Sequence, residues 1–441
     1  MQPENQAKLK QIAARVSGHN LAEKESIVKD IVENVKLLGD KAIAAYSKKF
    51  DKVEFDLSQT NPFQVKLIDS PLAKLSPDLQ SALKKAKTRI ETFHKTEAKE
   101  NNFKSGWQYK GKLGEKLGVQ YRALDSVAVY VPGGQAPLLS AVLMTAIPAK
   151  VAGVRRIVMI TPPPVNPGIL AAAELAEVDE IYSIGGAQAI VALAYGTQSI
   201  KAVDKIVGPG NIYVSLAKKQ VFGQVGIDGI YGPSELAIIA DDTASPKQLA
   251  ADLISQLEHG SGLESVLLVS TSKQIIKDTE SELNKQINDL ATRHKSPEQI
   301  NTIKSSLNKW SALLHAEDLE EAIEIINEYA PEHLEIHVHK SKLKDTVSKI
   351  KNAGAIFIGA NSCESLGDYM AGPSHSLPTG GTSRFSSGLQ CIDFMKRSSI
   401  IDFSAVKNSS QGFQEMINDV AAIARAEQLE GHARAMEYRK S

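Results

Sequence analysis

The feature that most constrains the fold is a regular alternation of short apolar runs and helical stretches through the middle of the chain. Four runs rich in Val, Ile and Ala end in Gly or Pro turn signals, and stretches with helical spacing separate them: 126–131, 156–160, 180–184 and 204–207. Strands that alternate with helices form βαβ units around a parallel sheet. The sequence therefore predicts the α/β class.

A second alternation starts at residue 236. Residues 236–240 and 266–269 read as strands, and Ser245, Pro246 and Gln248 form a capping-box pattern before a helix. A chain of 441 residues is too long for one core. We therefore expect two similar Rossmann-like α/β domains with parallel sheets, plus small N- and C-terminal helical extensions.

Local patterns complete the expected outline. Helices are predicted over 4–48, with a break at Gly39-Asp40, and over 77–99. A hairpin with its turn at Lys110-Gly111-Lys112 follows, and one final helix is expected over 413–438.

Three strands of the first alternation end in glycine-rich turns, namely Pro132-Gly133-Gly134, Gly185-Gly186 and Gly208-Pro209-Gly210. Such turns lie at the carboxyl ends of parallel strands, where ligands bind, and glycine lets the backbone approach phosphate. None is the full G-x-G-x-x-G fingerprint, so each alone is better explained as an ordinary turn between a strand and a helix. Three in one domain favour a nucleotide site.

Charge and composition exclude several classes of protein. Lys+Arg and Asp+Glu both number 51, so nothing favours nucleic acid as the partner. No apolar run is long enough to span a bilayer, and the N-terminus lacks a signal-peptide core, so no membrane partner is expected. Only Cys363 and Cys391 occur, which excludes a disulfide framework and favours a reducing, cytoplasmic compartment.

A loop from Gly367 to Gly381 combines four glycines and two prolines, which predicts irregular backbone instead of a helix or a central strand. It contains Asp368 and His375, two residue types that bind metals and substrates. A surface connection and a functional site remain equally good interpretations of this stretch alone.

Most of the ten histidines have an ordinary explanation. Four in polar surroundings are expected at the surface (His19, His94, His294 and His315), and His337 and His339 read as plain strand positions. Glu332-His333 could supply two proton-transfer groups or be a charged helix-to-strand junction. Gln256 and His259 share a helix face, and with Asp368 and His432 they are one of several sets that could bind Zn²⁺.

Ordered sequence blocks carry a family likeness over nearly the whole chain. They include Tyr130-Val-Pro-Gly-Gly134, Gly185-Gly-Ala-Gln-Ala189, Gly208-Pro-Gly-Asn211, Gly232-Pro-Ser-Glu235, Glu258-His-Gly260, Ala330-Pro-Glu-His-Leu334 and Leu377-Pro-Thr-Gly-Gly381. In this order they resemble the histidinol dehydrogenase family. The resemblance implies oxidation of L-histidinol to L-histidine through L-histidinaldehyde, with two NAD⁺ and one Zn²⁺ per subunit.

The resemblance also implies roles for particular residues, all of them expectations at this point. Zinc would bind Gln256, His259, Asp368 and His432, and these residues would also contact the substrate. The remaining implied roles are NAD contacts at Tyr130, Gln188 and Asn211, catalysis by Glu332 and His333, and substrate contacts at Ser234, Glu332, Glu364, His375 and Glu427.

The resemblance further implies a domain division and a homodimer. An extension over 1–23 would precede a zinc and catalytic domain formed by 24–121 and 235–380. An NAD domain would span 122–234, and a C-terminal segment over 381–441 would complete the partner subunit's site.

Three regions depart from the family pattern, around Gln135, Tyr231 and Gly262. They leave open a paralogue that oxidises another polar alcohol. A nucleotide-binding regulatory protein without catalysis is a third hypothesis, and it would require the loss of a catalytic or metal residue. For Cys363 and Cys391 we expect incidental or buried positions and no thiol chemistry.

Overall fold

The structure is a computed structural model, and it describes residues 3–13, 15, 21–133, 137–293 and 296–440. The chain forms two compact units. The first comprises Met1–Lys95 and Leu124–Phe394, and the second comprises Thr96–Ala123 and Met395–Ser441. Among the described residues, no helix has the length and apolar character that a membrane crossing requires.

The first unit contains two parallel five-stranded sheets. The first sheet has the order β5-β4-β3-β6-β7, with strands β3 (Ser126–Tyr130), β4 (Arg156–Thr161), β5 (Glu180–Ser183), β6 (Lys205–Val207) and β7 (Gly226–Ile227). Four helices alternate with them, namely α5 (Leu139–Ala152), α6 (Pro167–Leu175), α7 (Gly186–Tyr195) and α8 (Ile212–Val221). The predicted α/β class is confirmed.

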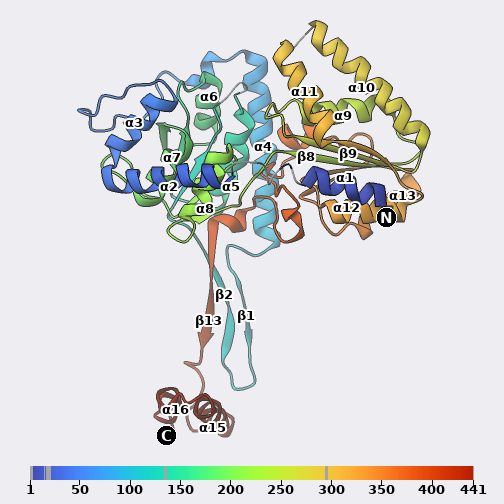
Figure 1. Ribbon diagram of the computed structural model, residues 1–441. Coiled ribbons are helices and arrows are strands. Elements are labelled where there is room, and N and C mark those ends of the chain that lie inside the picture. Colours follow the sequence, from blue (N-terminus) through green and yellow to red (C-terminus); the bar gives the residue numbers. More distant parts are fainter. Residues whose placement is uncertain (1–2, 14, 16–20, 134–136, 294–295, 441) are drawn as a thin grey trace. The chain divides into compact units, whose positions relative to one another are not determined.

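The second sheet repeats the same topology. Its order is β10-β9-β8-β11-β12, with strands β8 (Glu235–Ala240), β9 (Ser265–Ser270), β10 (Ala312–His315), β11 (His333–His337) and β12 (Ala355–Ile358). Its helices are α9 (Pro246–Leu257), α10 (Lys273–Arg293), α11 (Pro297–Trp310), α12 (Leu319–Tyr329) and α13 (Lys340–Lys349). In each sheet the first strand along the chain is central, so the two predicted similar domains are confirmed. Figure 1 labels β8 and β9 of the second sheet.

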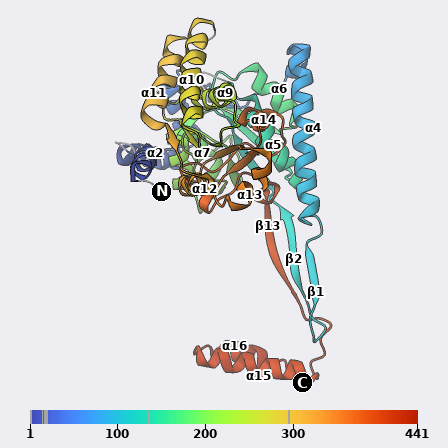
Figure 2. The same ribbon diagram turned by 90° about the vertical axis from the view of Figure 1, so that its right-hand side faces the viewer.

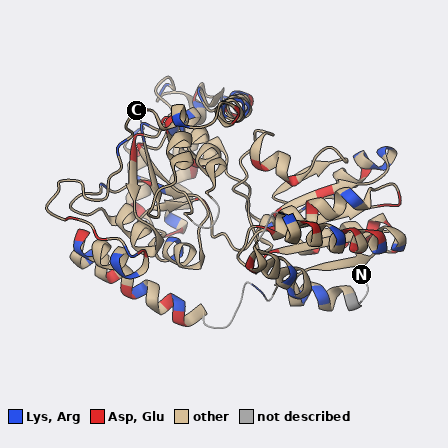
Figure 3. Ribbon diagram, turned by 90° about the horizontal axis from the view of Figure 1, so that it is seen from above, with Lys and Arg blue, Asp and Glu red and all other residues tan. Residues whose placement is uncertain are grey.

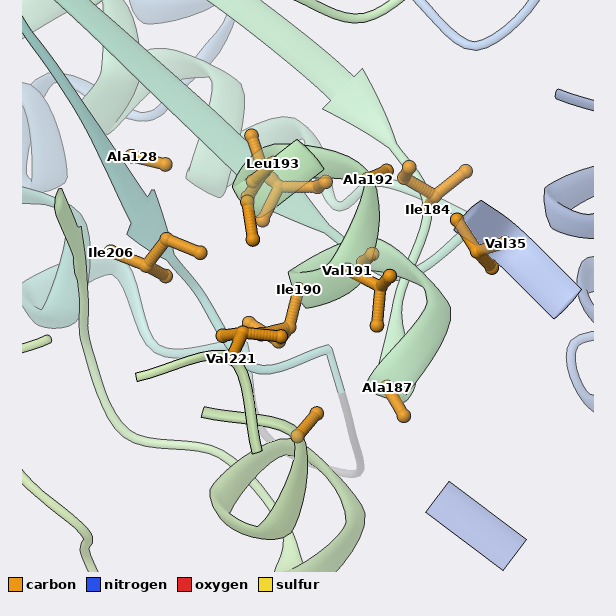
Figure 4. Close-up of a cluster of buried hydrophobic side chains, with 14 of the residues drawn as sticks. Val35, Ala128, Ile184, Ala187, Ile190, Val191, Ala192, Leu193, Ile206 and Val221 are labelled. Atoms are coloured by element: carbon orange, nitrogen blue, oxygen red, sulfur yellow. The ribbon is translucent and has the colours of Figure 1, made fainter. Parts of the chain in front are cut away.

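Hydrophobic clusters fill the space between sheets and helices. Helix α7 is buried almost all round, and its Ile190, Val191 and Leu193 belong to one hydrophobic cluster with Ile206 of β6 and Val35 of α2 (Leu21–Leu38) (Figure 4). A helix that is apolar on every side is stable only inside a core. Helix α1 (Pro3–Ala13) adds Leu9 and Ile12 to the cluster of the second sheet.

The expected grouping of residues 24–121 with the second sheet is wrong for three helices. Helices α2 (Leu21–Leu38), α3 (Asp40–Phe50) and α4 (Pro77–Glu100) place their buried residues in clusters around the first sheet. Helical periodicity shows which face of a helix is buried, but it does not show which sheet receives that face.

Three local predictions also differ from the structure. The described Ser245 side chain makes no capping hydrogen bond, whereas Ser296 and Gln299 form a full capping box at α11. Residues Glu364–Tyr369 form the short helix α14, so regular helix extends into the start of the stretch from Gly367 to Gly381, where glycine and proline predicted irregular backbone. His94 is buried, not exposed, because it lies on the inner face of α4.

The second unit is built on a three-stranded antiparallel sheet, β1 (Trp107–Lys110), β2 (Lys116–Ala123) and β13 (Met395–Asp402). The predicted hairpin is confirmed; Figure 2 labels its strands. The prediction of one final helix over 413–438 is wrong. Helices α15 (Gln411–Ala426) and α16 (Glu430–Glu437) are separate, because Gln428 between them adopts a positive φ of 62°. Residues 381–394 belong to the first unit instead of to a C-terminal extension.

Charges of both signs are mixed along the helices visible in Figure 3. This mixture agrees with the balanced composition and with the absence of a basic excess in the sequence.

Candidate active and metal site

One face of α9 supplies the first polar row of the site. Asp252 and Gln256 are spaced i and i+4, which places them on one side of α9. His259 lies in the turn that follows, two residues after Leu257, where α9 ends, so the expected shared helix face does not extend to it. Gln256 is fully buried, and within the described chain neither its Oε1 nor its Nε2 has a hydrogen-bond partner. A buried amide without a partner costs free energy, so Gln256 is poised to bind a group that the protein itself does not supply.

Strand β11 supplies the second row. His333, Glu335 and His337 alternate along the strand, so they point to the same face of the sheet. All three are buried, which is unusual for charged residues in the interior of a parallel sheet.

The backbone of Glu235 in neighbouring β8 fixes the pair Glu332 and His333. The Glu332 Oε2 accepts the backbone N–H of Glu235 at 2.9 Å. The His333 Nδ1 lies 3.0 Å from the Glu235 carbonyl oxygen. A carbonyl can only accept, so Nδ1 carries a proton, and in the neutral imidazole Nε2 is the nitrogen with the free lone pair. That Nε2 has no hydrogen-bond partner among the described residues.

Helix α14 brings two carboxylates to these rows. The Glu364 Oε1 lies 3.7 Å from the Nε2 of His259, and the Asp368 Oδ1 lies 4.0 Å from the Nε2 of His333. Ligand atoms of His259, Glu364 and Asp368 all lie within 4.8 Å of one another. Imidazole and carboxylate groups at this spacing, beside the unpartnered amide of Gln256, fit a divalent metal such as Zn²⁺.

Burial and nearby charged groups shift the pKa values of Glu332 and His333. Burial raises the pKa of Glu332 from 4.5 to about 7, although nearby His333 opposes the shift. Burial lowers the pKa of His333, but the carboxylates of Glu332, Glu364 and Asp368 outweigh burial and raise it. Perturbed groups that converge in this way are typical of functional sites.

Burial and neighbouring charges also shift the pKa values of the candidate metal-site residues. Burial lowers the pKa of His259, but Glu364 raises it to about 9. Burial raises the pKa of Glu364. A cation would relieve this excess of negative charge.

The loop after α14 connects the site to the first domain. His375 Nε2 lies 3.2 Å from the Ser140 hydroxyl of α5, and Ser374 donates to the Met144 carbonyl at 2.9 Å. Burial lowers the pKa of His375, which favours its neutral form. Ser234 lies next to Glu235 at the start of β8. The loop that sequence reasoning left undecided is therefore adjacent to the site.

The three expected nucleotide contacts lie at carboxyl ends of the first sheet. Tyr130 ends β3, and its hydroxyl accepts the Gly186 N–H at 3.2 Å. Gln188 is buried in the first turn of α7. Asn211 caps α8 by accepting from the N–H groups of Tyr213 and Val214.

Strands β3 and β6 flank the point where the strand order reverses, which is where doubly wound sheets bind dinucleotides. Gly208 follows β6 with φ of 107°, and a Cβ there would overlap the Tyr130 carbonyl oxygen. Only glycine lets these two chain segments approach so closely.

Glu427 and His432 belong to the second unit. Glu427 ends α15, and His432 lies in the first turn of α16. Both are exposed. Arg425 anchors this helix corner through ion pairs with Glu430 and Glu437.

Sequence reasoning missed Asp252, Glu335 and His337. Their ligand atoms lie within 4.8 Å of one another beside the expected site. The signal was present in the sequence, because these residues continue the α9 spacing of Gln256 and the β11 alternation of His333.

Two of the three regions that depart from the family sequence pattern have a structural explanation. The Tyr231 ring packs under the Lys218 ammonium, which is paired with Asp228. Gly262 adopts φ of 78° in a turn whose N–H groups bind the Glu264 carboxylate. Gln135 lies outside the described residues. Cys391 is buried, and Cys363 precedes α14.

The fold and the site together define a class: two doubly wound α/β domains, one with a glycine-lined switch point and one with a largely buried cluster of histidines and carboxylates. A model of the family "Histidinol dehydrogenase" matches residues 15–440. The chain belongs to the histidinol dehydrogenase family.

Individual relatives agree with this assignment. The chain is 45% identical to the histidinol dehydrogenase of Bacillus subtilis, over 95% of this chain and 93% of the relative. It is 45% identical to that of Clostridium acetobutylicum, over 96% and 94%. The crystal structure of histidinol dehydrogenase from Elizabethkingia anophelis is similar with a TM-score of 0.84 and 35% identity, and the match covers 94% of this chain and 91% of that one.

Proposed function

We propose that the protein is an NAD-dependent, zinc-dependent histidinol dehydrogenase that oxidises L-histidinol to L-histidine through L-histidinaldehyde. The observation that carries this proposal is the cluster of His259, Glu364 and Asp368, whose Asp368 also lies near His333. The unpartnered amide of Gln256, in the last turn of α9, supports it. Family membership supports the substrate. The composition of the chain, with only two cysteines, favours a cytoplasmic location.

His333 is the base for the alcohol proton in this proposal. Its Nδ1 proton is committed to the Glu235 carbonyl, so Nε2 is directed away from β8 and is available to accept. Removal of the alcohol proton accompanies hydride transfer to the nicotinamide. A positioned base contributes about 10²–10⁴-fold to such a step.

Glu332 is the base that activates water for hydration of the aldehyde. Its raised pKa, about 7, places it close to neutral pH, where a general base is most efficient. The hydrated aldehyde then releases a second hydride, so each substrate reduces two NAD⁺.

Gln256, His259, Asp368 and His432 would bind the zinc ion. When bound, zinc supplies a Lewis acid that holds the nitrogen donors of the substrate and positions the carbinol carbon. His375, Ser234, Glu364 and Glu427 would orient the substrate around it, and Tyr130, Gln188 and Asn211 would contact NAD⁺.

A homodimer is part of the proposal. Glu427 and His432 are exposed and belong to the second unit, which agrees with a segment that serves the site of another subunit. Mixing inactive His432→Ala protein with inactive His333→Asn protein would test this. Restored activity in mixed dimers is expected, and no restoration would contradict shared sites.

The test of function is a turnover assay that counts NADH per L-histidinol consumed. Two NADH and one L-histidine per substrate are expected, with one zinc per subunit by metal analysis. One NADH per substrate, or activity only with other amino or sulfo alcohols, would contradict the proposal and favour a paralogue.

A further inference from the structure

A second polar layer lies beside the expected catalytic and metal residues. Asp252 lies on the face of α9 that carries Gln256, and Glu335 and His337 lie on the face of β11 that carries His333. None of these three residues takes part in the proposed reaction.

Glu335 occupies the centre of this layer. Its side chain has no exposure to solvent. One carboxylate oxygen, Oε1, accepts the backbone N–H of Glu364 at 2.7 Å. The other, Oε2, lies 3.0 Å from the Nε2 of His337. Both oxygens are therefore committed to partners, and the arrangement works as a support instead of as an open ligand site.

The bond to Glu364 replaces a missing helix cap. Cys363 is the N-cap of α14, and in the described structure it makes no side-chain capping hydrogen bond. Glu335 supplies an acceptor for the first helical N–H from the neighbouring strand. Negative charge at a helix N-terminus also interacts favourably with the helix dipole.

Helix α14 is short, so its first turn determines where its side chains point. It carries Glu364, which lies 3.7 Å from His259, and Asp368, which lies 4.0 Å from His333. A displaced first turn would move both carboxylates relative to α9 and β11.

We propose that Glu335 is a positioning residue whose buried carboxylate holds α14, and through it Glu364 and Asp368, in the geometry that metal and substrate require. This inference rests on the proposed function for the nature of the ligands. Residues that orient metal ligands typically change metal affinity by about 10–100-fold when they are removed.

Asp241 offers a matched control. It is also a buried carboxylate at the end of a strand of this sheet, and its Oδ2 accepts the N–H of His339, the N-cap of α13, at 2.9 Å. Removal of this carboxylate should disturb a helix start without moving a ligand.

The experiment compares full-length Glu335→Leu, Glu335→Gln and Asp241→Leu with wild type. Zinc affinity is measured by competition with a chelator, without substrate or NAD⁺, and thermal unfolding is measured in parallel. We expect Glu335→Leu to weaken zinc binding about 10–100-fold. Glu335→Gln, which keeps an acceptor for the Glu364 N–H, should recover most of the affinity. Asp241→Leu should lower stability but leave zinc affinity unchanged.

Equal zinc affinity in Glu335→Leu and wild type would overturn the proposal, as would equal weakening in both leucine variants. Two zinc ions per wild-type subunit would also overturn it, because the layer would then be a metal site itself. If Glu335→Leu does not fold, Glu335→Asp replaces it, since a shorter carboxylate cannot keep both contacts. Unchanged affinity in that variant would equally contradict the role.

The outcome is separable from that of the proposed function. A wild-type protein that binds one zinc but leaves L-histidinol unchanged would contradict the function. The chelator measurements would still decide the role of Glu335.

Discussion

The two sheets of the first unit share one strand order, yet they use it differently. Strand β6 of the first sheet and β11 of the second occupy equivalent positions beside the central strand. β6 reads Lys-Ile-Val, with two buried apolar residues, whereas β11 reads His-Leu-Glu-Ile-His and is buried throughout. One position in the same topology therefore carries core packing in one domain and chemistry in the other.

The ligand sites differ accordingly. The first sheet offers glycine turns and helix N-termini at its carboxyl ends, where backbone amides suit a dinucleotide. In the second sheet Glu332 and His333 lie at the start of β11, and the site is built from side chains of β11, α9 and α14. A fold defines where ligands can bind, but the residues on each strand decide which chemistry follows.

The largest expected effect comes from the base on β11. His333→Asn should reduce hydride transfer from L-histidinol by about 10²–10⁴-fold, because the accepting Nε2 is lost. The matched change on the equivalent strand is Ile206→Val, which should cost about 0.5–1.5 kcal/mol of stability and leave the rate unchanged. Pre-steady-state NADH formation measures the first, and urea unfolding measures the second. Similar rate losses in both variants would break the comparison.

Glu332→Gln should separate the two halves of the reaction. Oxidation of L-histidinaldehyde should fall by about 10²–10⁴-fold, because the base for hydration is gone, while alcohol oxidation falls less. In wild type the aldehyde half should rise with pH through about 7, where the Glu332 carboxylate ionises. NADH formation from each substrate across pH 5–9 measures both effects. Equal losses in the two halves would exclude the assigned role.

Metal-free protein should show the cost of burying Glu332. The pKa of this carboxyl is raised from 4.5 to about 7, so the folded state holds its proton more tightly than the unfolded state. Its contribution is fully present below about pH 4.5 and is lost as pH rises through about 7. Glu332→Gln should therefore be up to about 3 kcal/mol more stable than wild type at pH 8 and similar at pH 4. Denaturant unfolding in EDTA measures the difference, and a pH-independent difference would contradict this explanation.

The smallest effect is expected at the first sheet. Asn211→Ala should cost about 1 kcal/mol of stability, because its side chain caps α8. Asn211→Asp keeps the cap and should retain stability. If Asn211 contacts the cofactor, both variants should raise the KM for NAD⁺. A rise of the KM in the alanine variant alone would show that Asn211 only caps α8.

Much of the fold could be predicted because its signals are local. Apolar runs with turn residues located both sheets, and helical spacing placed Gln256 on α9, whereas His259 lies in the turn just beyond the end of that helix. Where two local signals competed, prediction failed. Glycine and proline indicated a loop from Gly367, yet α14 extends into it. The first N–H of this helix, that of Glu364, donates to Glu335 of strand β11.

The sequence by itself determined the α/β class, the pair of similar domains and, through its ordered motifs, the family and the expected site residues. Only the tertiary structure decided that α2 to α4 cover the first sheet, that Glu235 fixes the tautomer of His333, and that Glu335 supports α14. The physical reason is the distance along the chain over which each interaction acts. Periodicity and turn chemistry act over a few residues, whereas each of these contacts joins segments that are brought together only by sheet formation and core packing.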